Sequence, residues 1–411
     1  GRSERDERHI CLARDSLVLT HGDGHKPIQD VAIGDLVLTH TGRWMPVIAK
    51  QMTGYSDVVK VKAQGVEVRV TPTHRFWAKS SNDAKYHPKK AAMRSAPEWI
   101  EAVNLNGCYL NMKLSPDTYT DSDKLKWWMV GRWIADGHID QRDVAHISCG
   151  ADKLGSFLEM AGDYAGNPQK RTAYQVPLKD PGRVLRSILD ECGKLAHGKH
   201  LPPIAFNLDK DTSSALLEGY LSGDGHYRPE RNRWYATSVS RELLLGLKFL
   251  VQRVHGEVAS IHAGRKPGTT TIEGRTVNTR QELVLSWSGT SHSFSFVDDD
   301  GAWQKVKSVE PDGQSETWNL RVAEDASYTA EGCVVKNCPL QVCLIERSVQ
   351  MWSSPGEVVF SPFAGVGSEG VGAIRQGRRF VGIELKDSYY RQAIKELNAA
   401  VEKQNQGSLF A

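Results

Sequence analysis

The sequence predicts a multidomain protein in which an all-β domain is split by an α+β insert and is followed by an α/β segment. Three observations predict this. Short β-branched runs separated by Gly, Asp and Pro fill residues 11–113 and return from residue 299. A helix–strand–helix pattern occurs twice in the middle of the chain. After residue 338 the chain reads as a strand, a Gly-rich loop, a helix and a second strand.

Length and composition are those of a globular protein with several domains. The chain has 411 residues, 40% hydrophobic and 25% charged, with a formal net charge of +3. This charge permits nucleic-acid binding without indicating it. No apolar run approaches the roughly 18 residues of a membrane span, and no secretory leader opens the chain, so no membrane partner is expected. The seven cysteines include no CxxC pair, which favours a reducing cytoplasm over a disulfide framework or a zinc site.

Changes in the residue pattern along the chain set the expected domain boundaries. The all-β domain covers 11–113 and 299–337, and the α+β insert covers 114–298. The insert opens with "SPDTYTDSD", a linker that ends in a helix cap. Reading "RDERHI" directly into "CPLQVCLIERSV" gives a continuous charged-to-helical sequence. This continuity indicates that 11–337 is an insertion between a tail, 1–10, and a segment, 338–411.

The two ends of this insertion carry residues that can react with each other. A Cys thiolate is a strong nucleophile, so the Cys11 sulfur can attack the Ile10 carbonyl and turn that amide into a thioester. Cys338 can then take over the upstream segment. The Asn337 side-chain amide can attack its own carbonyl carbon, which forms a succinimide and cuts the chain before Cys338. A final S-to-N shift joins Ile10 to Cys338. The ordinary interpretation of a single Cys is a small buried hydrophobic residue, and that of Asn-Cys is a turn. The two together, between flanking segments that read as one continuous sequence, favour the reaction.

These segments resemble an intein. "CLARDSLVLT" resembles the opening block of the family, "VTPTHRFWA" the second block, and "TWNLRVAEDASYTAEGCVVKNC" the closing blocks. The resemblance implies an all-β Hint-type splicing fold, splicing without a cofactor, and a monomeric splicing domain. It also implies that Thr71 and His74 hydrogen-bond and strain the amide before Cys11. Considered alone, a histidine such as His74 is more often a buried core residue than a catalytic one.

Two positions depart from the family pattern. Lys336 precedes the terminal Asn where the family usually has His, and Ala326 stands where a second His is usual. A lysine with a pKa of about 10.4 is mostly protonated at neutral pH, so it can donate to a developing oxyanion but is a poor base unless desolvated. We therefore expect slow Asn cyclisation, or help from Asp325, Ser327 or water.

The repeated unit of the insert ends each of its first helices at an aspartate. "WWMVGRWIADGHID" and "ALLEGYLSGDGHYR" place Gly131 and Gly219 on an apolar face and Asp136 and Asp224 in matching Asp-Gly-His steps. A carboxylate at a helix C-terminus opposes the macrodipole, so two of them indicate a compensating cation. An oxygen-rich pair suits Mg²⁺. The ordinary alternative is two helix-ending Asp-Gly turns.

These motifs resemble LAGLIDADG homing endonucleases over about 120–297. The resemblance implies a pseudo-two-fold α+β domain whose strands enter the major groove of double-stranded DNA, with Asp136 and Asp224 as catalytic metal ligands. "GKHLPPIAF" resembles the block that supplies a catalytic lysine, which makes Lys199 a candidate; a solvated surface lysine is equally plausible. "HAGRKPGTTTIEGRTVNTR" reads as a basic hairpin that can contact DNA phosphates or bases.

The last segment contains a ligand loop. In "VVFSPFAGVGSEGVGAIRQGRRFVGIEL" glycines follow a strand, and an acid about 20 residues on can bind ribose hydroxyls. With "CPLQVCLIERSV" it resembles the C-terminal part of amino-group (N4-cytosine or N6-adenine) DNA methyltransferases. This implies an α/β Rossmann-like fold that binds S-adenosylmethionine through Phe363, Gly365, Gly367 and Glu384. Ser361 departs from the usual Asp. The catalytic Asp/Asn/Ser-Pro-Pro-Tyr/Phe motif is absent, so we expect an upstream segment or another chain to supply it.

The sequence therefore predicts a self-splicing intein with a homing endonuclease, interrupting a DNA methyltransferase in the cytoplasm of a bacterial or phage-infected cell. One alternative is a methyltransferase fragment whose insert has lost splicing, which Lys336 and Ala326 favour. Another is a DNA-binding module with a degenerate nuclease, which the retained Asp136 and Asp224 oppose.

Overall fold

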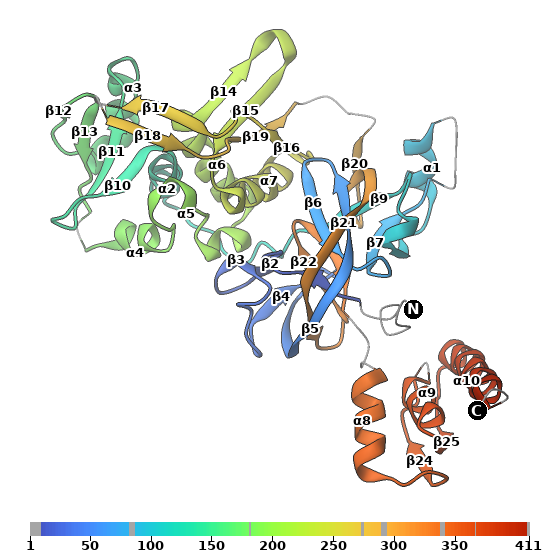
Figure 1. Cartoon of the computed structure of the whole chain (residues 1–411). Helices are drawn as coiled ribbons and strands as arrows, with labels where there is room; N and C mark the ends of the chain where they lie inside the picture. Colours follow the sequence, from blue (N-terminus) through green and yellow to red (C-terminus); the bar gives the residue numbers. More distant parts are fainter. Residues whose placement is uncertain are drawn as a thin grey trace. The chain divides into compact units, whose positions relative to one another are not determined.

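The computed structural model describes residues 10–81, 87–180, 182–272, 275–288, 294–337, 342–365 and 367–408. The chain divides into two compact units, Gly1–Asn337 and Cys338–Ala411 (Figure 1). The division falls at the Asn337–Cys338 peptide bond, the bond that the sequence marks. Cys338 itself, residues 1–9 of the predicted tail, and Val366 of the predicted ligand loop lie outside the described residues. No described helix is both long and apolar enough to cross a membrane.

A 13-stranded sheet in the first unit is built from both ends of the predicted insertion. Its early strands are β1 (Leu12–Ala13), β2 (Leu17–Thr20), β3 (Gly24–Pro27), β4 (Leu36–Leu38), β5 (Trp44–Ala63), β6 (Val66–Val70), β7 (Arg75–Lys79), β8 (Glu98–Glu101) and β9 (Tyr109–Met112). Its late strands are β20 (Ser295–Asp298), β21 (Gly301–Val322), β22 (Ser327–Ala330) and β23 (Cys333–Lys336). Late strands pair with early ones: β22 with β2, β23 with β7, and β21 with β1, β5 and β9. Helix α1 (Pro88–Arg94) lies between β7 and β8.

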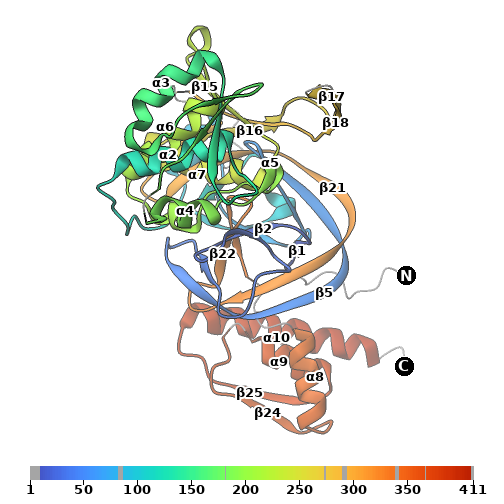
Figure 2. The same ribbon diagram turned by 90° about the vertical axis from the view of Figure 1, so that its left-hand side faces the viewer.

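Two long strands replace the shorter runs that the turn residues predict. Strands β5 and β21 pair antiparallel along most of their length and curve together (Figure 2). The pairing has register shifts between Pro311 and Gln314 and between Thr317 and Trp318. Extra residues in one strand of a ladder bend and twist it without ending it. The turn signals around Gly313 and Gly54 therefore mark bends within continuous strands.

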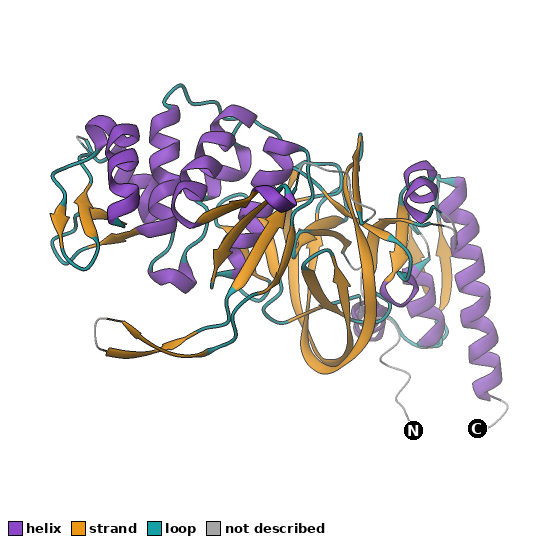
Figure 3. Ribbon diagram, turned by 90° about the horizontal axis from the view of Figure 1, so that it is seen from above, coloured by secondary structure: helices purple, strands orange, loops and turns teal. Residues whose placement is uncertain are grey.

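The insert consists of two matching halves. Helix α2 (Lys124–Asp136) precedes the sheet β10-β11-β13-β12, and helix α6 (Lys210–Asp224) precedes the sheet β14-β15-β19-β16. The strands are β10 (Gly137–Ile139), β11 (Ala145–Cys149), β12 (Gln169–Lys170), β13 (Tyr174–Pro177), β14 (Gly225–Arg228), β15 (Arg233–Ser238), β16 (Ser260–Ala263) and β19 (Leu283–Trp287). The other helices are α3 (Ala151–Ala161), α4 (Val184–Asp190), α5 (Leu195–Gly198) and α7 (Arg241–His255). Hairpin β17 (Gly268–Ile272)–β18 (Arg275–Thr279) projects from this part (Figures 1 and 3).

The two long helices of the insert touch through their glycines. A Cβ added to Gly131 would lie 2.0 Å from the Leu216 carbonyl oxygen, and one added to Gly219 would lie 2.0 Å from the Trp128 carbonyl oxygen. Only glycine permits this approach of the two backbones. Further along, a Cβ added to Gly223 would lie 2.5 Å from the Ala135 Cβ, so the contacts advance in the same direction on both helices and their C-terminal ends lie together.

The second unit is a small α/β arrangement. It contains α8 (Val342–Trp352), β24 (Val358–Ser361), α9 (Ser368–Arg375), β25 (Arg379–Gly382) and α10 (Asp387–Ser408). Strands β24 and β25 are parallel. One face of this sheet packs Val359 and Phe380 against the helices. The alternate residues of the other face, Val358, Phe360 and Val381, are each about half exposed.

Candidate functional site

Cys11 lies fully buried at the start of β1, between β6 and β21. The Cys11 N–H, which belongs to the Ile10–Cys11 amide, donates to Thr71 Oγ1 at 3.0 Å. The Thr71 N–H in turn donates to the Cys11 carbonyl oxygen at 3.0 Å. Thr71 therefore contacts the amide on which the predicted first step acts.

His74 is fully buried in the turn that leads into β7. Burial lowers the pKa of His74 to about 3, while its interaction with the Ile10 backbone acts in the opposite direction. Apart from this interaction with Ile10, neither ring nitrogen has a hydrogen-bond partner among the described atoms. His74 is thus a neutral imidazole next to the carbonyl that Cys11 would attack.

Two threonines near the sulfur were not found by sequence reasoning. Thr53 Oγ1 donates to Cys11 Sγ at 3.2 Å and lies 2.8 Å from Thr317 Oγ1. A donor to sulfur favours the thiolate form. Thr53 lies on β5 and Thr317 on β21, and only the pairing of these strands reveals their convergence on Cys11.

Asn337 is almost fully buried just after β23. Its N–H donates to the Ala326 carbonyl at 3.0 Å, and its side-chain Nδ2 donates to the Val322 carbonyl at 3.3 Å. Lys336 is half-buried with Nζ 5.4 Å from the centre of the Trp99 ring. Burial, and then the charge of Arg75, lower the pKa of Lys336. Desolvation thus moves this lysine toward the condition in which it can act as a base.

The register of β23 on β7 brings the two junctions together. Val335 pairs with Phe76 in an antiparallel ladder. Continued by two residues, this register sets Asn337 across from His74, which contacts the Ile10 backbone. The described parts of both predicted reaction ends therefore share one small region of the sheet.

The two helpers expected beside Lys336 both hold the turn between β4 and β5. Asp325 accepts hydrogen bonds from Thr39 and Thr41, each at 2.6 Å, and pairs with Arg43. Ser327 Oγ lies 2.8 Å from Nδ1 of His40 and accepts from the His40 N–H at 3.1 Å. Asp325 is thus paired with one arginine and accepts from two hydroxyls. Ser327 instead contacts the imidazole of His40, which the sequence analysis did not single out.

The paired helices bring Asp136 and Asp224 together. Asp136 Oδ2 would be 2.8 Å from a Cβ at Gly223, the residue before Asp224. Burial, and then the charge of Asp136, raise the pKa of Asp224 to about 6. Arg132 forms an ion pair with Asp136. The two carboxylates therefore lie close together. Asp136 is paired with Arg132, whereas the ionised form of Asp224 is disfavoured.

Lys199 lies at the same place and is buried rather than solvated. Its Nζ donates to the carbonyls of Trp133 at 3.0 Å and Gly137 at 2.8 Å. Burial lowers the pKa of Lys199 to about 8, although both aspartates act in the opposite direction. The three predicted residues thus form one cluster at the ends of α2 and α6.

This cluster fits Mg²⁺ by its donor chemistry. Within the described residues no three His, Cys, Asp or Glu side chains gather as a ready-made metal site. Mg²⁺ needs less, since it is commonly held by one or two carboxylates with waters and phosphate oxygens completing the shell. A cation between Asp136 and Asp224 would offset both the burial and the repulsion by Asp136 that raise the pKa of Asp224.

In the second unit the predicted loop residues are brought together in part. The Gly365 N–H donates to Glu384 Oε2 at 2.9 Å. Gly365 and Gly367 have φ of +55° and +86°, conformations that favour glycine. Phe363 is 85% exposed. Glu384 therefore lies against the Gly-rich loop, and the exposed ring of Phe363 is accessible to a ligand.

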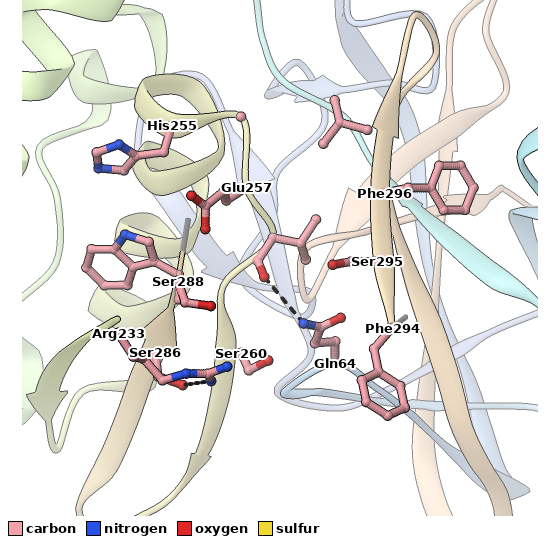
Figure 4. Close-up of a pocket in the computed structure, with 14 residues that line it drawn as sticks. Gln64, Arg233, His255, Glu257, Ser260, Ser286, Ser288, Phe294, Ser295 and Phe296 are labelled. Atoms are coloured by element: carbon pink, nitrogen blue, oxygen red, sulfur yellow. Dashed lines mark hydrogen bonds between the residues drawn. The ribbon is translucent and has the colours of Figure 1, made fainter. Parts of the chain in front are cut away.

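A separate cavity of about 510 Å³ holds none of the predicted site residues (Figure 4). Its polar lining includes Arg233, which donates to Ser286 Oγ at 3.3 Å, and Gln64, which donates to the Val258 carbonyl at 3.4 Å. Figure 4 shows these two hydrogen bonds beside further polar residues that line the cavity, among them Glu257, Ser260 and Ser295.

A family model described as DNA methylase matches residues 210–395. This range begins in α6 and crosses Asn337. The DNA adenine methyltransferase YhdJ of Escherichia coli is 39% identical over 57 residues, which cover 14% of this chain and 19% of YhdJ. The chain thus contains a region related to DNA methyltransferases, which are enzymes, as the Gly-rich loop predicts. The 57-residue similarity to YhdJ is short enough to fit within Cys338–Ala411, whereas the family match also extends over residues 210–337.

Longer matches occur to proteins with other names. The ATP-dependent DNA helicase Hel308 of Thermococcus kodakarensis is 24% identical, covering 80% of this chain and 36% of the helicase. The iron-sulfur cluster assembly SufBD family protein Rv1461 of Mycobacterium tuberculosis is 23% identical, covering 87% of this chain and 46% of that protein. The chain therefore spans less than half the length of these relatives.

Among solved structures, a DnaB intein from Synechocystis sp. PCC 6803 aligns with a TM-score of 0.27 and 9% identity, covering 80% of this chain and 97% of the intein. The N-terminal LAGLIDADG domain of DUF199/WhiA aligns with a TM-score of 0.23 and 10% identity, covering 40% of this chain and 75% of that domain.

Proposed function

We propose that residues 11–337 excise themselves by autocatalytic protein splicing, without a cofactor, and join Ile10 to Cys338. The observation that carries this proposal is the shared location of the two ends. Strand register sets Asn337 across from His74, and His74 contacts the backbone of Ile10. A reaction that transfers one end of a chain to the other requires this proximity.

The longer matches support an inserted element. Hel308 and Rv1461 share no activity in their names, yet each matches 80% or more of this chain over less than half of its own length. A segment that recurs within otherwise different proteins is expected of an insert that leaves its host after translation.

The residues of the first junction have separate roles in this reaction. Thr53, with Thr317 behind it, stabilises the Cys11 thiolate. Thr71 holds the Ile10–Cys11 amide nitrogen. As the thioester forms, neutral His74 takes up the proton that the Cys11 thiol loses and passes it to that nitrogen, so the C–N bond breaks and the ring ends neutral. At the second junction the Asn337 Nδ2 leaves the Val322 carbonyl and attacks its own carbonyl carbon.

An intact-mass time course of the chain with a tag at each end tests splicing. We expect a ligated product of residues 1–10 and 338–411 beside free 11–337. Matched chains with Cys11→Ala or Asn337→Ala should each lose the ligated product. Persistence of only the full-length mass, with no cleavage on adding thiol, would contradict the proposal. Cleavage with thiol at Cys11 alone would support the alternative of a splicing-impaired methyltransferase fragment.

A second activity proposed for the insert is Mg²⁺-dependent cleavage of double-stranded DNA. It is favoured by the convergence of Asp136, Asp224 and buried Lys199 at the contact of two matching helices. Hairpin β17–β18 and the two flanking sheets are the proposed DNA-contacting elements. In a plasmid-nicking assay over random-sequence libraries, Asp224→Asn should abolish Mg²⁺-dependent nicking, while Asp163→Asn in an exposed turn serves as control. Equal nicking by both variants would leave a DNA-binding insert without nuclease chemistry.

We also propose that the ligated host binds S-adenosylmethionine through Phe363, Gly365, Gly367 and Glu384 and completes its fold with an upstream methyltransferase segment. Parallel strands are usually covered on both faces, whereas alternate apolar residues of β24 and β25 are exposed. Isothermal titration of the full chain with S-adenosylmethionine tests the loop: Glu384→Gln should weaken binding, and Glu402→Gln on α10 should not. Identical binding by these two variants would exclude Glu384 as a ligand.

A further inference from the structure

The turn between β4 and β5 places an imidazole beside the second junction. His40 lies in this turn, half-buried, with its ring 5.4 Å from the Trp77 ring and 5.6 Å from the Trp99 ring. The Lys336 Nζ lies 5.4 Å from the same Trp99 ring. His40 and Lys336 therefore contact one indole, and Lys336 adjoins the Asn337 that is to be cyclised.

Both neighbours of Ala326 hold this turn in place. Asp325 accepts from Thr39 and Thr41 on either side of His40. Ser327 accepts from the His40 N–H at 3.1 Å and contacts Nδ1 at 2.8 Å. The Ser327 hydroxyl has one proton and two lone pairs, so it can accept from the backbone N–H and still either donate to Nδ1 or accept from it. The His40 ring thus stays hydrogen-bonded to Ser327 in either tautomer.

Ser327 also ties His40 to the reacting strand. Ser327 pairs with Lys336 across the β22–β23 ladder, so their side chains lie on one face of the sheet. The Asn337 N–H binds the Ala326 carbonyl one step further. The turn, Ser327 and Lys336 form a continuous set of contacts that ends at the bond to be cut.

We propose that His40 is the proton-exchange partner of Lys336 in cleavage after Asn337. The inference rests on the proposed splicing reaction and adds a positioning residue to it. His40 acts through Lys336 and Ser327 rather than on the reacting atoms.

The protons of this step balance. Asn337 Nδ2 forms a bond to its own carbonyl carbon and loses a proton, while the bond to the Cys338 nitrogen breaks and that nitrogen gains a proton. Lys336 delivers a proton to the leaving nitrogen. Lys336, once it has given up its proton, takes up the proton released by Nδ2 and exchanges protons with His40 through Ser327, so both residues end as they began and no other reactant is consumed.

The surroundings of His40 keep its imidazole in the form that can accept a proton. Burial is the largest effect and lowers the pKa of His40. The charge of Asp325 raises this pKa, whereas the charges of Lys113, Lys336 and Arg43 lower it. Cleavage should therefore rise with pH through an inflection below 6.5 and then level off.

The test measures cleavage after Asn337 by intact mass from pH 5 to pH 9, in the full tagged chain with Cys11→Ala so that only this bond breaks. We expect His40→Asn to slow cleavage about 10-fold or more and to remove the inflection. Ser327→Ala should slow cleavage less and retain an inflection. His21→Asn, at a ring that contacts Trp44 in another turn, should match the parent chain.

Two further measurements keep the outcomes distinct. In chains that retain Cys11, thiol-induced cleavage before Cys11 should be unchanged by His40→Asn, which shows that the fold is intact. If His40→Asn also slows thiol-induced cleavage, the pH profile of cleavage after Asn337 in the parent chain decides. A parent profile without an inflection below pH 6.5 overturns the inference. An unchanged rate and profile in His40→Asn also overturns it. A parent that splices while His40→Asn leaves the rate and pH profile of cleavage after Asn337 unchanged contradicts this inference alone, whereas a parent that never cleaves after Asn337 contradicts the proposed splicing as well.

Discussion

The two junctions of the insertion are assembled in different ways. At the first, Cys11, Thr71 and His74 come from two short sequence blocks, and the structure places them in contact with one amide. At the second, neither position 326 nor position 336 is a histidine, and the imidazole comes from a distant turn held by Ser327. Under the proposed mechanism, the second junction would thus take its imidazole from a different chain segment than the closing block.

The largest expected effect separates the two junctions completely. Asn337→Ala removes the only side chain that can form the succinimide, so cleavage after residue 337 should disappear. The first junction should continue to react, since Thr71 and His74 are untouched. Thiol-induced cleavage measured by intact mass should therefore stay within about two-fold of the parent chain. Loss of both reactions would mean that the junctions are not independent.

Replacing Thr71 should have the next largest effect, confined to the first junction. Thr71→Val removes the acceptor of the Cys11 N–H. This hydrogen bond affects the rate only by as much as it is stronger in the transition state than in the ground state. A difference of about 1–3 kcal/mol corresponds to a rate loss of roughly 5- to 150-fold. The rate of thiol-induced cleavage checks this.

A matched control lies two residues away. Among the described atoms, the buried Thr73 hydroxyl has no hydrogen-bond partner, so Thr73→Val should leave the rate unchanged. An equal loss in Thr71→Val and Thr73→Val would mean that the turn tolerates no change of shape, and the hydrogen bond would lose its assigned role.

Thr53→Val should weaken the first junction more mildly. Without the Thr53 hydroxyl the Cys11 sulfur loses one donor, the thiolate is less favoured, and cleavage should slow by about 10-fold at neutral pH. The loss should shrink as the pH rises, because alkaline solution ionises the thiol in both chains. Thr329→Val, at another buried hydroxyl without a partner among the described atoms, is the control. A loss that is independent of pH would contradict an effect on thiolate formation.

Sequence reasoning named candidate residues that lie in continuous blocks and did not name those that depend on strand pairing. The reactive ends, the paired aspartates and the Gly-rich loop follow from local patterns and a repeat. Thr53 and Thr317 meet only because β5 pairs with β21. His40 reaches the second junction only because Asp325 and Ser327 bind its turn. Lys199 was equally plausible as a surface residue, since burial cannot be read from "GKHLPPIAF".

The smallest expected effect concerns stability in acid, and it compares the histidines of the two junctions. His74 has a folded-state pKa of about 3, below the ordinary value near 6.5. Between these two pKa values the unfolded chain therefore binds one more proton than the folded chain. Above pH 6.5 His74 does not change the free energy of unfolding, and as the pH falls toward 3 it lowers that free energy progressively. The slope is at most about 1.4 kcal/mol per pH unit for one proton.

His74→Phe should make the free energy of unfolding fall less steeply between pH 6.5 and 4, as measured by urea unfolding at each pH. His25, which is buried against Phe206 and has a pKa that is likewise lowered to about 3, gives an independent comparison. His25→Phe should reduce the slope by a similar amount while leaving both cleavage rates unchanged. His40→Asn should reduce the slope less, because the ring of His40 is only half-buried. A slope that depends on His40 more than on His74 would place the acid-sensitive part of the sheet at the second junction instead of the first.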